Sequence, residues 1–168
     1  RQLQDARLPQ ILSGLLAHYQ LAASTIELEI TETFLMADIQ SSADLLASLK
    51  AQGCHLAMDD FGTGYSSLAY LAKLPVDVLK LDRSLLLDLE DSPQCASMVR
   101  HMIRMAHELG LQVVAEGIES EGQVRLLREM SCDLVQGFVF STALDLASFT
   151  LYLQQQPAVA QLEQFADA

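Results

Sequence analysis

Features that would mark several large functional classes are missing from this sequence of 168 residues. No segment approaches the roughly 20 apolar residues that a membrane-spanning helix needs, and the N-terminus lacks the basic-then-apolar pattern of a secretory signal. The cysteines, Cys54, Cys95 and Cys132, are odd in number, far apart and without metal-ligand spacing. This pattern predicts free thiols in a reducing compartment. We therefore expect a cytoplasmic domain without membrane contact of its own, alone or as the cytosolic part of a larger or membrane-tethered protein.

Basic charge and two familiar ligand motifs are also lacking. The net charge is −12, so there is no basic stripe with which to bind polymeric nucleic acid. A small phosphate ester remains compatible with this charge, because bound divalent cations make an acidic pocket attractive to phosphate. No G-x-G-x-x-G loop follows an expected strand, which argues against a nucleotide cofactor. Zinc spacing is absent among the four histidines, which are His18, His55, His101 and His107.

The chain does contain an alternation of short apolar runs and helical patterns. Hydrophobic residues make up 51% of it, enough to bury the core of one domain or of a large piece of one. The apolar runs, which indicate strands covered on both faces, are Ile26–Ile30, His55–Met58, Asp77–Leu81, Gln112–Ala115 and Leu134–Phe140. The helical patterns are Ile39–Gln52, Ser67–Lys73, Pro93–Leu109, Glu121–Met130 and Leu146–Gln155. This alternation predicts βα units and an α/β fold with parallel strands.

Polar residues collect where the expected strands end. In chain order they are Glu29 and Glu32, Asp59 and Asp60, Lys80 and Asp82, Glu116 and Glu119, and Gln136 within the fifth run. Functional side chains spread over the carboxyl ends of several strands are typical of the catalytic face of a (β/α)8 barrel. We therefore favour a barrel-like arrangement over a doubly wound sheet.

The stretch Met58–Ser67 places two adjacent carboxylates, Asp59 and Asp60, between an apolar run and a turn that contains two glycines. Two neighbouring acids at the end of a buried strand repel each other unless a cation or a proton compensates them. In a regular strand they would point to opposite faces, so both can serve one cluster only if the strand ends here, as Gly62 and Gly64 allow. Taken alone, the stretch fits either an ordinary turn or a divalent metal site.

Lys80 is the second unusual residue, because it lies inside an apolar run, between Leu79 and Leu81. Its charge needs a partner. One possibility is a local ion pair with Asp82 at the strand end. The other is that Lys80 reaches into the acidic cluster and holds a water or a phosphate oxygen there.

The acids at the strand ends form an oxygen-only ligand set, made of Glu29, Asp59, Asp60 and Glu116. Such ligands favour Mg²⁺ or Mn²⁺ over zinc. Two such ions held side by side could deprotonate a water and stabilise the leaving oxygen of a phosphoryl displacement. The set therefore indicates hydrolysis of a phosphodiester.

Taken together, the motifs resemble those of the EAL-type phosphodiesterases, which linearise the bacterial second messenger cyclic diguanylate (cyclic di-GMP). In order, they are Glu27-Leu28-Glu29-Ile30-Thr31-Glu32, Asp59-Asp60-Phe61-Gly62-Thr63-Gly64-Tyr65-Ser66-Ser67, Leu74-Pro75-Val76-Asp77-Val78-Leu79-Lys80-Leu81-Asp82, Val113-Val114-Ala115-Glu116-Gly117-Ile118-Glu119 and Asp133-Leu134-Val135-Gln136-Gly137-Phe138. They span nearly the whole chain. The resemblance implies a TIM-barrel-like fold, here with about five βα units, a homodimer, and hydrolysis of cyclic di-GMP to linear pGpG.

The resemblance also implies a role for each matching position. Glu29 and Asp59 would hold a first Mg²⁺ or Mn²⁺ ion, and Asp59 would bridge to a second ion bound by Asp60 and Glu116. Catalysis would fall to Lys80, which orients the attacking water, together with Glu116. Substrate contacts would come from Glu119 and Gln136. A mobile loop, with Phe61, Gly62, Thr63 and Gly64 in it, would be anchored by Glu32 and would couple the metal site to dimerisation.

The chain departs from the family pattern in two places. The family's Glu-Ala-Leu motif and an Asn in Asn-Leu-Ser, both first-metal ligands, would precede Arg1. Residues 1–156 are thus expected to be the C-terminal two-thirds of an EAL domain, followed by a tail or linker at 157–168, and activity is expected to need the missing N-terminal segment. Ser141-Thr142-Ala143 stands where the family has a basic residue and then proline. Two alternatives to the enzyme are an inactive cyclic di-GMP receptor and a dimerisation scaffold.

Overall fold

The computed structural model describes residues 5, 7–31, 34–35, 39–62 and 71–155. Its strands are β1 (Glu27–Thr31), β2 (His55–Phe61), β3 (Val78–Leu81), β4 (Gln112–Ala115) and β5 (Leu134–Val135). Its α-helices are α1 (Leu8–Tyr19), α3 (Ile39–Ala51), α5 (Pro93–Glu108), α6 (Glu121–Glu129) and α7 (Leu146–Gln155), and two short 3-10 helices are η2 (Ala23–Thr25) and η3 (Arg83–Leu85). None of the helices in these ranges is long and apolar enough to cross a bilayer.

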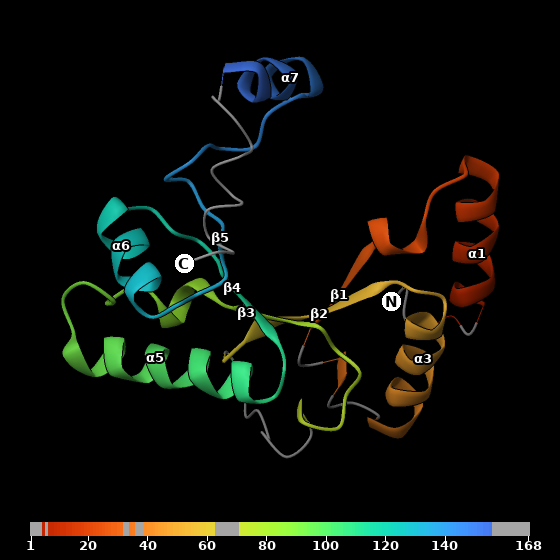
Figure 1. Cartoon of the computed structure of the whole chain (residues 1–168), viewed down its shortest axis with the longest axis horizontal. Helices are drawn as coiled ribbons and strands as arrows, with labels where there is room; N and C mark the ends of the chain where they lie inside the picture. Colours follow the sequence, from red (N-terminus) through yellow and green to blue (C-terminus); the bar gives the residue numbers. More distant parts are fainter. Residues whose placement is uncertain (1–4, 6, 32–33, 36–38, 63–70, 156–168) are drawn as a thin grey trace.

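The strands form a single parallel sheet whose spatial order, β1-β2-β3-β4-β5, is also the order of the chain. Successive right-handed βα units produce this order, because each crossover places the next strand beside the last one. The α/β fold with parallel strands is therefore confirmed. Strands β1 and β5 lie at the two edges of the sheet (Figure 1).

The helices lie where their end signals predict. Pro93 opens α5 after Ser92, whose hydroxyl accepts a hydrogen bond from Cys95 N, and Gly110 at φ 77° follows its C-terminus. A capping box formed by Ser120 and Gln123 opens α6. The pattern at Ser67–Lys73 lies largely outside the described residues, as does the tail at 157–168. Helix α1 was missed, because its N-cap residue, Arg7, makes no side-chain capping hydrogen bond and Gly14 interrupts its apolar pattern.

Two strand predictions were wrong at their C-terminal ends. Strand β2 does not end at Met58 but continues through both aspartates to Phe61. Strand β5 stops at Val135 instead of continuing to Phe140. It stops because Gly137 packs directly on the loop after β4, where an added Cβ would lie 2.0 Å from the carbonyl oxygen of Ile118.

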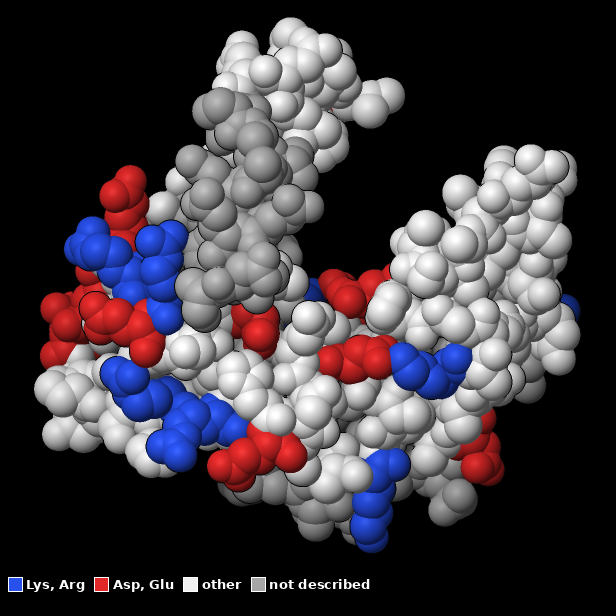
Figure 2. Space-filling model, in the orientation of Figure 1, with Lys and Arg blue, Asp and Glu red and all other residues white. Residues whose placement is uncertain are grey.

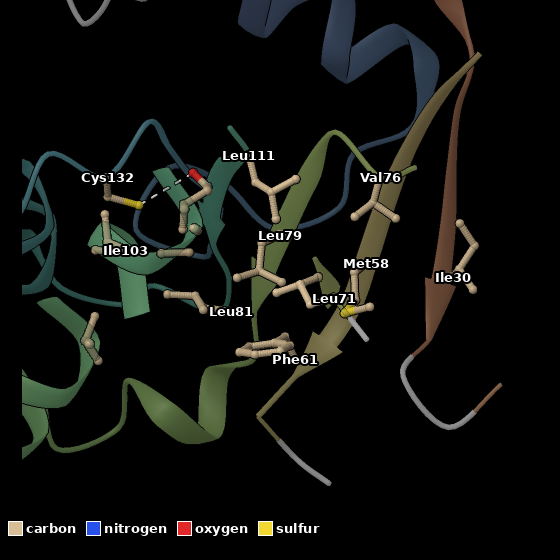
Figure 3. Packing of buried hydrophobic residues seen from close by; sticks show 14 of the residues in the cluster. Ile30, Met58, Phe61, Leu71, Val76, Leu79, Leu81, Ile103, Leu111 and Cys132 are labelled. Atoms are coloured by element: carbon tan, nitrogen blue, oxygen red, sulfur yellow. Dashed lines mark hydrogen bonds between the residues drawn. The ribbon is translucent and has the colours of Figure 1, made fainter. Parts of the chain in front are cut away.

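The two faces of the sheet have different surroundings. Helices α3, α5 and α6 pack against one face and enclose the main hydrophobic cluster with it (Figures 1 and 3). In that cluster Leu79 and Leu81 of β3 lie beside Met58 and Phe61 of β2, and Ile103 reaches it from α5. The opposite face, called the inner face below, carries a much smaller cluster of Ala57, Val78 and Val114. Strand alternation explains the division, since neighbouring residues of one strand point to opposite faces.

All three cysteines are free thiols, as predicted. Cys54 and Cys132 are buried, and burial raises the pKa of Cys132 to about 12. The cysteines therefore belong to the packing of the fold and not to its chemistry.

Candidate functional site

The inner face changes from apolar to charged along the strands. Ala57, Val78 and Val114 occupy its middle, and the next inward positions toward the carboxyl ends are Asp59, Lys80 and Glu116. Figure 2 shows acidic side chains at the floor of a hollow between the uncharged surfaces of α1 and α7. The predicted cluster of site residues at the carboxyl ends of neighbouring strands is thus present in the structure.

Lys80 lies at the centre of this cluster. Its side chain is only 7% exposed, and its Nζ donates to Glu29 and lies 2.7 Å from Glu116 Oε1 and 3.4 Å from Asp59 Oδ1. Burial alone would lower the pKa of Lys80, but its hydrogen bonds to Glu116 and Glu29 outweigh burial and raise that pKa above its ordinary value. Lys80 is therefore a fixed cation that ties together strands β1, β2, β3 and β4. Lys80 thus reaches into the acidic cluster, as the second alternative expected, and its role toward a water or a phosphate oxygen stays a prediction. Asp82 instead accepts hydrogen bonds from Ser84 N and Oγ.

The two adjacent aspartates are separated by an irregularity in β2. The register between β2 and β3 shifts between Met58 and Phe61, and Asp60 adopts a left-handed backbone at φ 55°. Aspartate tolerates this conformation better than most residues. A bulge of this kind re-aims a side chain beside a functional site. It replaces the expected strand end as the reason why both carboxylates can serve one cluster.

The cluster holds more negative than positive charge. Burial, together with repulsion from Asp59 and Asp82, raises the pKa of Asp60. Asp59 Oδ1 is buried and accepts no hydrogen bond, although it lies within ion-pair distance of Lys80. A buried carboxylate oxygen that accepts no hydrogen bond is costly. The site thus has capacity for an additional cation.

The donor set fits a hard divalent cation in its chemistry, because every donor is a carboxylate oxygen. In the described parts of the chain, no three His, Cys, Asp or Glu side chains are arranged to hold a metal ion. The carboxylates of Glu29 and Glu116 contact Lys80 Nζ instead. Asp59 Oδ1, which is buried without a hydrogen bond, is the feature that most directly fits a metal.

Glu119 and Gln136 lie at the rim of the cluster. Glu119 Oε1 pairs with Arg83 Nη2 at 2.7 Å, and both side chains are about half exposed. Gln136 is exposed at the end of β5, and its backbone is fixed by bonds to Ala115 and Ile118. Arg83 was not among the residues predicted from the sequence. Its position, three residues after Lys80 at a strand end, was the available signal.

The predicted loop residues are only partly described. Phe61 is the last residue of β2, and its side chain is buried in the main hydrophobic cluster (Figure 3). Gly62 has φ +98°, and a Cβ there would lie 2.5 Å from Leu85 Cδ1, so a side chain would strain the backbone and displace Leu85. Glu32, Thr63 and Gly64 lie outside the described residues.

Comparison with known proteins places this geometry in a family context. The family model described as "EAL domain" matches residues 1–143. The protein named cyclic di-GMP phosphodiesterase NbdA, from Pseudomonas aeruginosa, is 48% identical over 134 residues, which cover 80% of this chain and 17% of NbdA. This chain spans about a fifth of the length of three of the curated relatives that it matches.

Two solved structures extend the similarity to three dimensions. One is titled PaMucR phosphodiesterase in complex with c-di-GMP; it matches with a TM-score of 0.83 and 35% identity, covering 88% of this chain and 60% of that one. The other is BlrP1 of Klebsiella pneumoniae, crystallised with cy-diGMP and either calcium or manganese. It matches with a TM-score of 0.78 and 31% identity, covering 84% of this chain and 36% of that one.

Proposed function

Because this chain belongs to the EAL domain family, we propose that it carries the greater part of the active site of a metal-dependent phosphodiesterase that hydrolyses cyclic di-GMP to linear pGpG. The observation that carries the proposal is the convergence of Glu29, Asp59 and Glu116, from three strands, on the buried Lys80. Such a cluster is costly to bury. It is accounted for most simply if the site binds a charged substrate with the help of cations.

Glu29, Asp59, Asp60 and Glu116 are the residues proposed to hold two divalent cations, Mg²⁺ or Mn²⁺. Cations bound at such carboxylates lower the pKa of a water molecule and neutralise negative charge that builds up on phosphate. The manganese and calcium complexes of BlrP1 support the choice of divalent cations.

The remaining roles belong to side chains of this chain. Lys80 keeps its charge at neutral pH, so it can hold a water or a non-bridging phosphate oxygen by a charged hydrogen bond. Glu116 accepts a hydrogen bond from Lys80 and so fixes the direction of the ammonium group. Glu119 and Gln136, at the rim, are proposed to contact the substrate.

An open sheet of five strands leaves part of its inner face exposed. Leu134, which is paired with Val114 in the register, is 47% exposed. We propose that residues 1–156 form the C-terminal two-thirds of an EAL domain, that residues 157–168 are a tail or linker, and that the complete protein is a homodimer. The extent of the MucR match, 60% of that chain, supports this division.

The test uses the longest natural polypeptide that contains this chain. It is incubated with cyclic di-GMP and Mn²⁺, and the products are separated by chromatography and identified by mass. Formation of linear pGpG that stops when EDTA is added is the expected result. The matched control is Asp145→Asn, which changes an exposed carboxylate at the start of α7 and should leave the rate unchanged.

Two other outcomes would contradict the proposal in different ways. Tight binding of cyclic di-GMP without turnover would identify a receptor. If the protein neither binds nor hydrolyses cyclic di-GMP, the dimerisation scaffold is the alternative that remains. Sizing measurements would then test it.

A further inference from the structure

Two aspartates outside the acidic cluster occupy equivalent positions in the fold. Asp77 precedes β3 and Asp133 precedes β5. Asp77 Oδ2 accepts the backbone N–H of Leu56, in β2, at 2.9 Å. Asp133 Oδ2 accepts the backbone N–H of Val113, in β4, at 2.7 Å. Each carboxylate therefore joins the start of its own strand to the preceding strand.

Each aspartate also binds a side chain from the helix that leads into that preceding strand. Lys50, near the end of α3, donates to Asp77, and His107 Nε2, near the end of α5, lies 2.8 Å from Asp133 Oδ2. Lys50 precedes Leu56 by six residues, and His107 precedes Val113 by six as well. The same arrangement of helix, strand and aspartate thus occurs twice, and we call each instance an aspartate clamp.

The clamps occur at the two strand pairs with the shortest regular pairing. The β2–β3 pair has two consecutive matched positions before its irregularity, and the β4–β5 pair has two in all. In contrast, β1–β2 has five matched positions and β3–β4 has four. A pair with few matched positions has few ladder hydrogen bonds that join its strands. A hydrogen bond between a side chain at the start of one strand and the backbone of the other adds a restraint on the register of the pair.

The clamps also lie at a fixed distance from the candidate site. Three residues beyond Leu56 and Asp77 are Asp59 and Lys80. Three residues beyond Val113 and Asp133 are Glu116 and Gln136. At about 3.3 Å per residue, each clamp sits roughly 10 Å from the site residues of the same two strands. A change of register at the clamp would therefore displace one site residue relative to its neighbour.

We propose that Asp77 and Asp133 are positioning residues, which set the register of β3 on β2 and of β5 on β4 and so hold Lys80 beside Asp59 and Gln136 beside Glu116. The catalytic consequence rests on the proposed function, whereas the register itself does not. Asp77 makes the stronger clamp, because its own N–H also donates to the carbonyl of Leu56 at 2.8 Å, giving two bonds between the same two residues.

The first test measures the register directly in the longest polypeptide that contains the chain. Methyl groups of Ala57, Val78, Val114 and Leu134 are labelled, and NMR cross-peaks between Ala57 and Val78 and between Val114 and Leu134 are recorded, since the structure pairs these residues. Asp77→Ala should weaken only the first cross-peak, and Asp133→Ala only the second. Asp145→Asn, which also changes a carboxylate that accepts a backbone N–H, should alter neither.

The second test distinguishes the effect of the hydrogen bond to the strand from the effect of the negative charge. Asp→Asn keeps an oxygen that can accept the strand N–H, whereas Asp→Glu keeps the charge but moves the oxygens by one methylene. At both positions Asn should preserve the cross-peak and Glu should weaken it. These variants also serve if an alanine variant fails to fold. Unchanged cross-peaks in all the folded Ala and Glu variants would overturn the proposal.

Kinetics test the consequence for the site. Asp77→Ala should lower kcat for cyclic di-GMP about 100-fold, because a displacement of about 1 Å is enough for such a loss. Asp133→Ala should instead raise KM about tenfold, since it displaces a substrate contact. Full wild-type kcat and KM in both folded variants would contradict the positioning role. If the wild-type protein shows no hydrolysis, the proposed function fails. The NMR result would still show whether Asp77 and Asp133 set the strand register.

Discussion

The two faces of the sheet are made by the same strands and yet carry opposite kinds of residue. On the helix-covered face, Leu79 and Leu81 are fully buried in a large cluster. On the inner face, one residue away, Val78 belongs to a cluster of three small side chains and Lys80 is surrounded by carboxylates. In β3, the residues that pack in the main core therefore alternate with residues that face the acidic cluster. A substitution at one position should therefore affect one property with little effect on the other.

The largest effect is expected from Lys80→Met, which removes the positive charge at the centre of the acidic cluster and keeps most of the apolar part of the side chain. Hydrolysis of cyclic di-GMP should fall about 10³-fold, or about 4 kcal/mol in the barrier, because the group that holds the water or phosphate oxygen is lost. The measurement is kcat in saturating Mn²⁺. Lys73→Met, at an exposed lysine, is the matched control. A Lys80→Met variant with wild-type kcat would show that the inner face has no catalytic function.

Leu79→Ala probes the other face of the same strand. Leu79 is fully buried, so its truncation should lower the free energy of unfolding by about 2–5 kcal/mol. Val78→Ala, on the inner face, removes two methyl groups and should cost no more than about 1.6 kcal/mol. Both are measured by urea denaturation, followed by kcat at a temperature where the variants are folded. Equal losses of stability at the two positions would contradict the division between the faces.

Gly137→Ala sharpens the comparison at the edge strand β5. The added Cβ would meet backbone atoms of Ile118, which cannot move aside as a flexible side chain could. The free energy of unfolding should therefore fall by about 1–3 kcal/mol. The matched control is Gly14→Ala in α1, where no atom lies within 4 Å of the added Cβ. That change should stabilise the protein by about 0.5–1 kcal/mol, through helix propensity. Urea denaturation measures both, and a neutral Gly137→Ala would show that β5 is not held against the loop after β4.

The smallest effect is expected from Arg83→Gln at the rim. Its ion pair with Glu119 is about half exposed, and such pairs contribute at most about 1 kcal/mol. The free energy of unfolding should change by less than this amount, and the change should shrink further in high salt. A larger loss, insensitive to salt, would mean that the rim is as important for stability as the buried face.

Much of the fold could be predicted because hydrophobic periodicity reports burial directly. Leu79 and Leu81 flank Lys80 in an apolar run, and a parallel strand covered on both faces has this pattern. Helix α6 begins at Glu121 as predicted, where Ser120 and Gln123 form a capping box, and it ends one residue before the predicted Met130. Helix α1 was missed because its N-cap residue makes no side-chain capping bond and its contact with α3 joins segments far apart in the sequence.

The site could be predicted in its members but not in its arrangement. Lys80 and Glu116 follow from charges near strand ends, which meet at one edge of a parallel sheet. Glu29 was expected at the end of its strand, but it lies in the middle of β1, paired with Ala57 in the register. The bulge at Asp60 could not be predicted, since its left-handed backbone depends on the irregular pairing of β2 with β3. The aspartate clamps were missed for a similar reason. Asp77 and Leu56 are 21 residues apart, and only the sheet brings them together.

The central claim is that the carboxylates around Lys80 form a cation site for phosphodiester hydrolysis, and Asp59 tests it most directly because its Oδ1 is buried without a hydrogen bond. Mn²⁺ binding to the wild-type polypeptide and to Asp59→Asn is titrated by electron paramagnetic resonance, with cyclic di-GMP hydrolysis measured in parallel. The account predicts that the substitution weakens Mn²⁺ binding about 100-fold, with a corresponding loss of hydrolysis. Equal Mn²⁺ affinity in the two proteins, or wild-type hydrolysis that continues undiminished in EDTA, would contradict it.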